Sequence, residues 1–192
     1  MPFDAMNDTP DEALLVLYAN GDPDAAKALM MRLTPRALGY ASRLLNDQTE
    51  AEDVAQEAML RLWKIAPEWR QGEAMVSTWL YRVVTNLCTD RLRKKRSVAL
   101  DAVAEPADGR ASVAQGMIEG ERAAALKAAL ATLPERQRQA VVLRHLEGAA
   151  NPEIAQIMEI STEAVESLTA RGKRALTAAL ADRRKDLGYS DD

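Results

Sequence analysis

Helix-start signals recur along the chain and constrain it to an all-α fold more than any other feature does. A side-chain oxygen followed by proline caps the free amides of a helix and fills its first position. Four pairs have this form: Thr9-Pro10, Asp22-Pro23, Thr34-Pro35 and Asn151-Pro152. Thr49 and Glu52 add a capping-box pattern. Because no long segment alternates apolar and polar residues, we predict helices and no sheet.

The helical patterns fall into two blocks, which we predict to be two small helical domains. The first covers residues 10–96 and the second covers residues 117–187. Residues 97–116 contain Pro106, Gly109 and scattered acids without a long apolar period, which is typical of a flexible linker. A buried helix in this segment is the alternative. A chain of 192 residues with 47% apolar side chains is long enough for two small cores.

Composition excludes several classes of protein. The single cysteine, Cys88, rules out a disulfide framework and a cysteine-rich zinc site. No apolar run approaches the roughly 20 residues that span a bilayer, and the N-terminal stretch MPFDAMNDTPDEALL lacks the pattern of a signal peptide. We therefore expect a cytoplasmic protein with no membrane insertion, no metal and no cofactor.

Residues 49–66 form a predicted helix with an apolar stripe on one side and an acidic outer face. The outer face includes Asp53, Gln56, Glu57 and Leu60. A single exposed leucine means little, but between carboxylates it suits the apolar centre of a docking surface for a basic partner. A solvated helix face is the alternative. A metal site is disfavoured because no histidine lies nearby.

Residues 76–96 form a second amphipathic helix, whose polar face mixes cations with short hydrogen-bonding side chains. That face carries Arg82, Thr85, Asn86, Thr89, Arg93 and Arg96, and the basic end of the helix carries Arg91, Arg93, Lys94 and Lys95. This mixture suits contacts with DNA phosphates and base edges. The alternative is a solvated helix end that favours cations through the helix dipole, which leaves Arg82 and Asn86 unexplained.

The loop before this helix contains Trp69, Gly72 and Glu73. An aromatic platform beside polar groups can accept an unstacked base. The alternative is that Trp69 simply packs against the core.

The clearest DNA-binding pattern is a helix-turn-helix over residues 151–176. A short helix is followed by the turn 159–161 and a longer helix, which is the spacing of this motif. Its small core is expected to contain Ile154, Met158, Ile160, Val165 and Leu168. Glu159 stands where glycine usually adopts a left-handed conformation, at a cost of about 1 kcal/mol. The outward residues of the second helix are Thr162, Glu163, Glu166, Ser167, Arg171, Lys173 and Arg174. An ordinary helical hairpin is the alternative.

These segments occur in an order that resembles a known family. AEDVAQEAMLRLWK is followed by STWLYRVVTNLCTDRLRKK, a linker, LPERQRQAVVLRHLEG and the helix-turn-helix. Over about residues 12–180 the chain resembles a bacterial extracytoplasmic function (ECF, group IV) sigma factor of the sigma-70 family. The resemblance implies an all-α fold in which sigma region 2 and sigma region 4 are joined by a flexible linker.

The resemblance also implies partners and roles. The face with Asp53, Gln56, Glu57 and Leu60 would dock on the β′ clamp of core RNA polymerase. The loop at Gly72 and Glu73, with Arg82 and Asn86, would melt and read the −10 element of promoter DNA, and residues 91–95 would hold the backbone. The second domain would contact the β flap and read the −35 element around Ser167 and Arg171. The family usually has an anti-sigma factor, which would control this chain.

The recognition helix departs from the family pattern. Family members often read V-K-S-R-L, whereas this chain has Val165-Glu166-Ser167-Leu168-Thr169. Glu166 replaces a cation but can accept a hydrogen bond from cytosine N4. We expect a different −35 sequence or a weaker contact.

Three other functions compete with this interpretation. A stand-alone helix-turn-helix regulator would bind duplex DNA as a free dimer, but it leaves the first domain's acidic and basic helices unexplained. An enzyme is disfavoured because a lone histidine such as His145 is more often structural than catalytic, and the sequence contains no phosphate-binding loop, metal cluster or nucleophile motif. A protein-only adaptor leaves the recognition helix unexplained. The net charge of −4 argues against strong DNA binding by the free chain.

Overall fold

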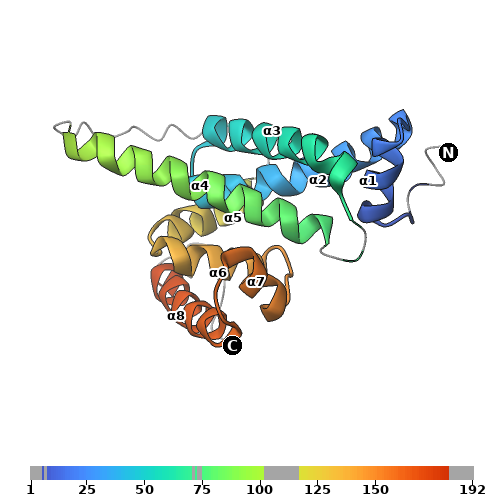
Figure 1. Cartoon of the computed structure of the whole chain (residues 1–192). Coiled ribbons are helices and arrows are strands. Elements are labelled where there is room, and N and C mark those ends of the chain that lie inside the picture. The colour runs from blue at the N-terminus through green and yellow to red at the C-terminus, as the bar shows by residue number, and fades with distance from the viewer. Residues whose placement is uncertain (1–5, 7, 71, 73–74, 102–116, 182–192) are drawn as a thin grey trace.

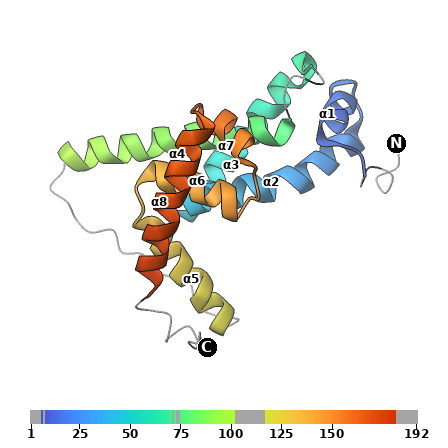
Figure 2. The ribbon, with the colours of Figure 1, turned by 90° about the horizontal axis from the view of Figure 1, so that it is seen from below.

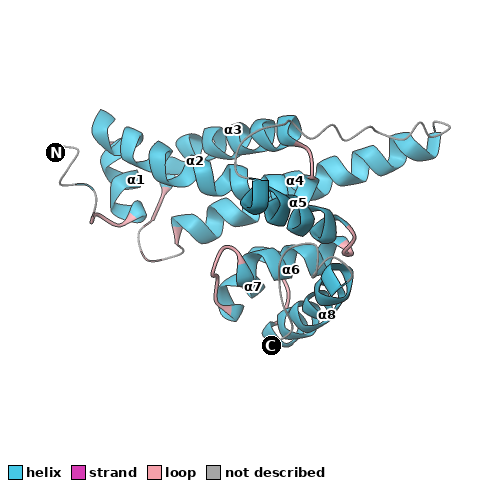
Figure 3. Cartoon of the chain, turned by 180° about the vertical axis from the view of Figure 1, so that it is seen from behind, coloured by secondary structure: helices cyan, strands magenta, loops and turns pink. Residues whose placement is uncertain are grey.

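A computed structural model describes residues 6, 8–70, 72, 75–101 and 117–181, and every regular element in these ranges is a helix (Figure 3). The first domain contains α1 (Asp11–Ala19), α2 (Pro23–Leu45), α3 (Gln48–Ile65), the 3-10 helix η2 (Ala66–Glu68) and α4 (Val76–Asp101). The second contains α5 (Met117–Ala131), α6 (Glu135–His145), α7 (Asn151–Met158) and α8 (Thr162–Ala181). The predicted all-α, two-domain fold is confirmed.

Most predicted helix starts are present, and Asp22-Pro23 behaves as expected. The Asp22 carboxylate accepts hydrogen bonds from the amides of Asp24 at 3.0 Å and Ala25 at 3.2 Å. Thr34-Pro35, however, lies inside α2 and starts no helix. Pro35 is on the exposed side, whereas Leu33 and Ala37 on either side of it are buried. Packing of these neighbours keeps the helix continuous through a proline that would otherwise interrupt it.

Three predicted caps are shifted by one or two residues. Pro10, rather than Thr9, is the N-cap residue of α1. Asp47, rather than Thr49, caps α3, because its Oδ1 accepts a hydrogen bond from the amide of Glu50 at 3.1 Å. Asn151 is the first residue of α7 rather than its cap. The Glu153 carboxylate accepts a hydrogen bond from the preceding amide, Ala150 N, at 2.7 Å.

The core of the first domain surrounds α2, which contacts α1, α3 and α4. The fully buried side chains on α2 include Leu29, Leu33 and Tyr40. Thr85 Oγ1 donates to the Tyr81 carbonyl at 2.7 Å and lies 2.9 Å from the Tyr40 hydroxyl. Since Thr85 has one hydroxyl proton, Tyr40 is the donor in the second bond.

In the second domain, α8 crosses α6 at close range, and α7 packs against both (Figure 2). Val165 and Gly172 are the buried residues of α8. Glu159 adopts the left-handed conformation, with φ 54° and ψ 50°, at the end of α7. Ile154, Met158 and Val165 are buried and Ile160 and Leu168 are half-buried, as a helix-turn-helix core requires.

The second domain packs beneath α4 and against α2 (Figure 1). Helix α4 continues to Asp101, so residues 97–101, predicted to begin the linker, are helical. Residues 102–116 and 182–187 lie outside the described residues.

Candidate polymerase and DNA surfaces

The predicted docking face on α3 is solvent-accessible. Asp53, Gln56 and Leu60 are exposed, and Glu57 is partly exposed and pairs with Arg61 at 2.9 Å. Gln56 and Leu60 point toward α2, whereas Asp53 and Glu57 lie on the side of α4. The four residues therefore form a strip along α3 between its two neighbouring helices.

Leu60 borders an apolar groove between α2 and α3 of about 350 Å³. The groove is lined by Met30, Thr34, Leu38, Met59, Leu60 and Trp63 among others. Met30 and Leu60 are 55% and 50% exposed, which is unusual for two large apolar side chains side by side. Sequence reasoning missed Met30 and Trp63. The sequence feature that could have indicated this groove is the adjacent pair Met30-Met31, because it lies on a helix that has only one buried side.

The polar face of α4 is partly covered. Arg82 and Asn86 are exposed as predicted. Thr85 is 2% exposed, so its predicted place on an open polar face is wrong, because its hydroxyl is satisfied inside the protein by Tyr40 and Tyr81. Thr89 accepts a hydrogen bond from Gln139 of the second domain at 3.1 Å.

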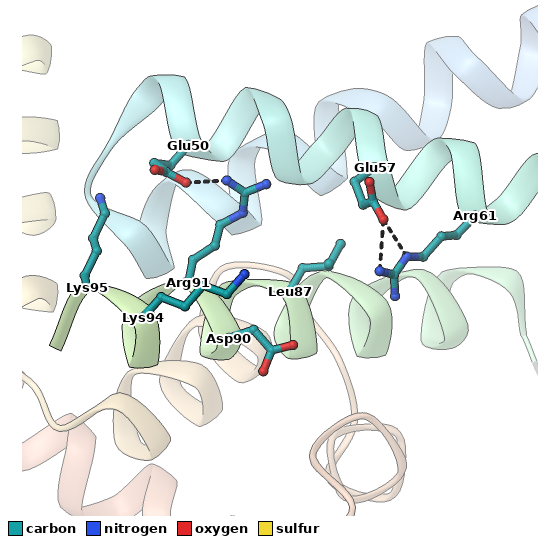
Figure 4. Close-up of a pocket in the computed structure, with 8 residues that line it drawn as sticks. All are labelled: Glu50, Glu57, Arg61, Leu87, Asp90, Arg91, Lys94 and Lys95. Carbon is teal, nitrogen blue, oxygen red and sulfur yellow. Dashed lines mark hydrogen bonds and ion pairs between the residues drawn. The ribbon is translucent and has the colours of Figure 1, made fainter. Parts of the chain in front are cut away.

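The basic end of α4 is paired with acids (Figure 4). Arg91 binds Glu50 and lies 4.0 Å from Asp53, and Lys95 binds Asp47 at 2.9 Å. Arg93 pairs with Asp90 at 2.7 Å, and Lys94 is exposed. Intramolecular acids therefore pair with these cations. The pairs of Arg93 and Lys95 are exposed and of the weak kind, whereas Arg91 and Glu50 are half-buried.

In the loop before α4, the structure describes Trp69, Arg70, Gly72 and Met75. The Trp69 ring meets Trp79 edge-on, with centroids 6.3 Å apart, and its buried Nε1 has no hydrogen-bond partner among the described residues. Gly72 is exposed with φ 92°, a conformation that glycine adopts at little cost. Glu73 lies outside the described residues.

The predicted recognition helix, α8, presents its polar residues away from the core. Glu163, Glu166, Ser167, Arg171, Lys173 and Arg174 are exposed, and Thr162 is half-buried. Ser161 caps the helix by accepting a hydrogen bond from the Ala164 amide at 3.2 Å. A hydrogen bond from its own backbone amide, assisted by Ser161, lowers the pKa of Glu163, so this carboxylate stays charged at the helix start.

A metal site, a membrane span and a reactive cysteine each have requirements that can be compared with the described residues. They contain no cluster of three metal-ligating side chains, and no helix among them is long and apolar enough to cross a membrane. Cys88 is fully buried, and burial raises the pKa of its thiol to about 12, which keeps it un-ionised.

Comparisons with known proteins decide between the remaining functions. The Sigma-70 region 2 family matches residues 29–98, and the Sigma-70, region 4 family matches residues 123–176. The RNA polymerase sigma-H factor of Pseudomonas aeruginosa is 30% identical over 181 residues, covering 88% of this chain and 93% of that protein. The chain belongs to the sigma-70 family. This sigma factor is also 30% identical over 173 residues to the ECF RNA polymerase sigma factor SigW of Bacillus subtilis, covering 84% and 92% of the two chains, which supports ECF type.

Solved structures agree with the fold of the sigma factor. CnrH, in complex with the cytosolic domain of CnrY, matches 90% of this chain and 97% of its own, with a TM-score of 0.66 and 25% identity. RpoE of Bartonella quintana, in complex with the anti-sigma factor NepR, matches 81% and 96% with a TM-score of 0.65 and 21% identity, which concerns the fold alone. Proteins of this family regulate transcription and are not known as enzymes, and the sigma factor initiates transcription by directing RNA polymerase to promoters.

Proposed function

We propose that this sigma factor belongs to group IV and works in the cytoplasm, where it guides core RNA polymerase to a specific set of promoters and helps to melt them. The observation that carries the proposal is that the docking and DNA-binding surfaces are divided between the two domains. One domain matches region 2 and exposes a docking strip and a DNA-reading face, and the other matches region 4 and exposes a recognition helix.

The docking role is assigned to Asp53, Gln56, Glu57 and Leu60, which would meet the β′ clamp of the polymerase. Leu60 with Met30 supplies the apolar centre of an interface, and the carboxylates of Asp53 and Glu57 supply a charged rim. A basic partner surface with one apolar side chain fits this strip and the groove beside it. The β flap would contact the second domain.

DNA reading is divided between the domains. The unpaired −10 element would be read and held by Arg82 and Asn86, together with Trp69, Gly72, Glu73, Arg91, Arg93, Lys94 and Lys95. The residues Thr162, Glu163, Glu166, Ser167, Arg171, Lys173 and Arg174 would meet the −35 duplex. Exposure of Arg82, Asn86, Glu166 and Arg171 supports this division. Glu166 would favour cytosine, through its N4 amine, at the position it reads.

An anti-sigma factor is the expected regulator. The resemblance to ECF sigma factors implies one, and the solved relatives RpoE and CnrH each carry a bound protein partner. Such a partner would compete with polymerase for the strip on α3 and the groove beside it.

A gel-shift comparison tests the proposal against a stand-alone regulator. Promoter fragments that carry both elements are incubated with the pure chain, with core polymerase, and with both together. We expect a specific shift only with both proteins present. A specific shift by the chain alone, with the mobility of a dimer, would instead support the regulator.

A further inference from the structure

A buried carboxylate of the second domain is held by two side chains of the first. Glu147 follows α6, and only 8% of its side chain is exposed. Its Oε1 accepts a hydrogen bond from Arg43 Nη1 at 2.9 Å, and its Oε2 accepts one from the Tyr81 hydroxyl at 2.7 Å. A charge withdrawn from water is stable only when it is paired and hydrogen-bonded. The buried Glu147 carboxylate therefore depends on both Arg43 and Tyr81.

The backbone that presents Glu147 is fixed by a tight turn. The Glu147 amide donates to the Val142 carbonyl at 3.0 Å, and the Ala149 amide donates to the Leu143 carbonyl at 2.9 Å. Gly148 between them has φ 74°, which suits glycine. The carboxylate is therefore held in place by its own domain before it meets the other.

Further polar contacts lie along the same boundary. Arg138 Nη1 donates to the Leu44 carbonyl at the end of α2 at 2.5 Å, and Gln139 bonds Thr89 at 3.1 Å. Arg96 on α4 pairs with Glu135 at 2.6 Å. Apolar packing crosses the same boundary, because the buried side chains of the two domains belong to one hydrophobic cluster, so these polar contacts act together with it.

This closed arrangement conflicts with the geometry of a promoter. Arg82, on the −10 face, lies 3.9 Å from Glu159 in the turn of the helix-turn-helix. Glu166 follows Glu159 by only seven residues, and even a fully extended chain of that length spans no more than about 25 Å. The −10 and −35 elements, by their numbering, are about 25 base pairs apart, or about 85 Å of duplex at about 3.4 Å per pair. The closed chain cannot contact both.

We infer that Glu147, Arg43 and Tyr81 form an interdomain latch, which closes the free sigma factor and must open before one promoter can be bound through both domains. The latch is a property of the chain alone, and only its consequence for promoters rests on the proposed function. Polymerase would contribute by binding the two domains at separate places, which holds the latch open. The free chain would accordingly bind promoter DNA poorly.

Small-angle X-ray scattering of the full chain tests the latch without polymerase or DNA. We expect wild type to have a radius of gyration near the compact value, about 16 Å for 192 residues. Glu147→Gln and Arg43→Glu should each increase it by a quarter or more, with unchanged helicity by circular dichroism. Glu68→Gln, the same change on an exposed residue of η2, is the matched control and should leave it unchanged.

Charge reversal separates a latch from a purely structural role. The double variant Arg43→Glu/Glu147→Arg restores an ion pair and should return the radius of gyration toward the wild-type value. An expanded wild type, or equal radii for wild type, Glu147→Gln and Arg43→Glu, would overturn the inference. If Glu147→Gln fails to fold, Arg43→Glu still tests the latch, because it breaks the same ion pair from the first domain. A compact wild type that supports no transcription with core polymerase would refute the proposed function and leave the latch intact.

Discussion

A Cβ atom at Gly172 on α8 would lie 2.5 Å from Cγ2 of Val141 on α6, a separation that is too short for two non-bonded carbon atoms. It would also lie 3.1 Å from the backbone oxygen of Gln137. Because a backbone oxygen is one of the neighbouring atoms, a rotamer change of Val141 alone cannot relieve all of the crowding. Gly172 therefore sets how closely the recognition helix approaches α6.

Gly172→Ala should destabilise the second domain by about 1–3 kcal/mol, because the added methyl overpacks the α6–α8 contact. Thermal unfolding followed by circular dichroism measures the loss. Gly120→Ala on α5 is the control, since a Cβ there meets no atom within 4 Å and alanine favours helix. Equal unfolding temperatures for Gly172→Ala and wild type would show that the close approach has no energetic importance.

Asp47→Ala should lower the free energy of unfolding of the first domain by about 1 kcal/mol, as loss of a helix cap does. Thr49→Ala should change it little, because Thr49 does not cap α3. The Lys95 hydrogen bond lowers the pKa of Asp47 below its unfolded value. The stabilisation is therefore present above about pH 4 and is lost as pH falls through the lower, folded pKa.

Urea unfolding at pH 7 and pH 2 measures this difference. We expect wild type and Asp47→Ala to differ at pH 7 and to converge at pH 2. A larger effect from Thr49→Ala than from Asp47→Ala would mean that Thr49 caps α3, as the sequence pattern predicted.

Asn86→Ala should reduce promoter opening about tenfold while core polymerase still binds. One lost hydrogen bond to an unpaired base corresponds to about 1–1.5 kcal/mol, and about 1.4 kcal/mol is tenfold. Permanganate reactivity of unpaired thymines reports opening, and gel filtration reports assembly with core. Asn20→Ala, the same change at the end of α1, is the control. Undiminished thymine reactivity in Asn86→Ala would remove Asn86 from the −10 surface.

Glu166→Lys should change the preferred base at one −35 position from cytosine toward guanine. A carboxylate accepts from cytosine N4, whereas an ammonium donates to guanine O6 and N7, and each such contact discriminates by about 1–3 kcal/mol. Competition binding of holoenzyme to a set of −35 variants measures the preference. Ala178→Lys introduces the same ammonium group near the end of α8, with a charge change of +1 instead of +2, and should raise affinity for all sequences alike. Unchanged preference in Glu166→Lys would mean that Glu166 reads no base.

Local patterns predicted the helices and the helix-turn-helix well, because caps, periodicity and turn chemistry act within a few residues. Even Glu159, a poor residue for a left-handed position, was placed correctly by the spacing of the motif. The Thr34-Pro35 signal failed because burial of Leu33 and Ala37 outweighs a local preference.

Contacts between distant segments could not be predicted from the sequence. Glu147 and Arg43 are 104 residues apart, and no local pattern in the sequence indicates that they pair. Thr85 was assigned to an open face because helical periodicity cannot show that Tyr40 reaches its hydroxyl. The acids that pair with Arg91 and Lys95 could likewise not be predicted, because they come from a different helix, α3, and its cap.

Run-off transcription with core RNA polymerase is the most direct test of the central claim, which is that this chain supplies promoter recognition to the polymerase. Genomic fragments upstream of genes from the source organism serve as templates, with core alone and chain alone as controls. We expect discrete transcripts from a small set of fragments only when chain and core are combined, and loss of these transcripts when either element is mutated. No promoter-specific transcript from any fragment would contradict the account.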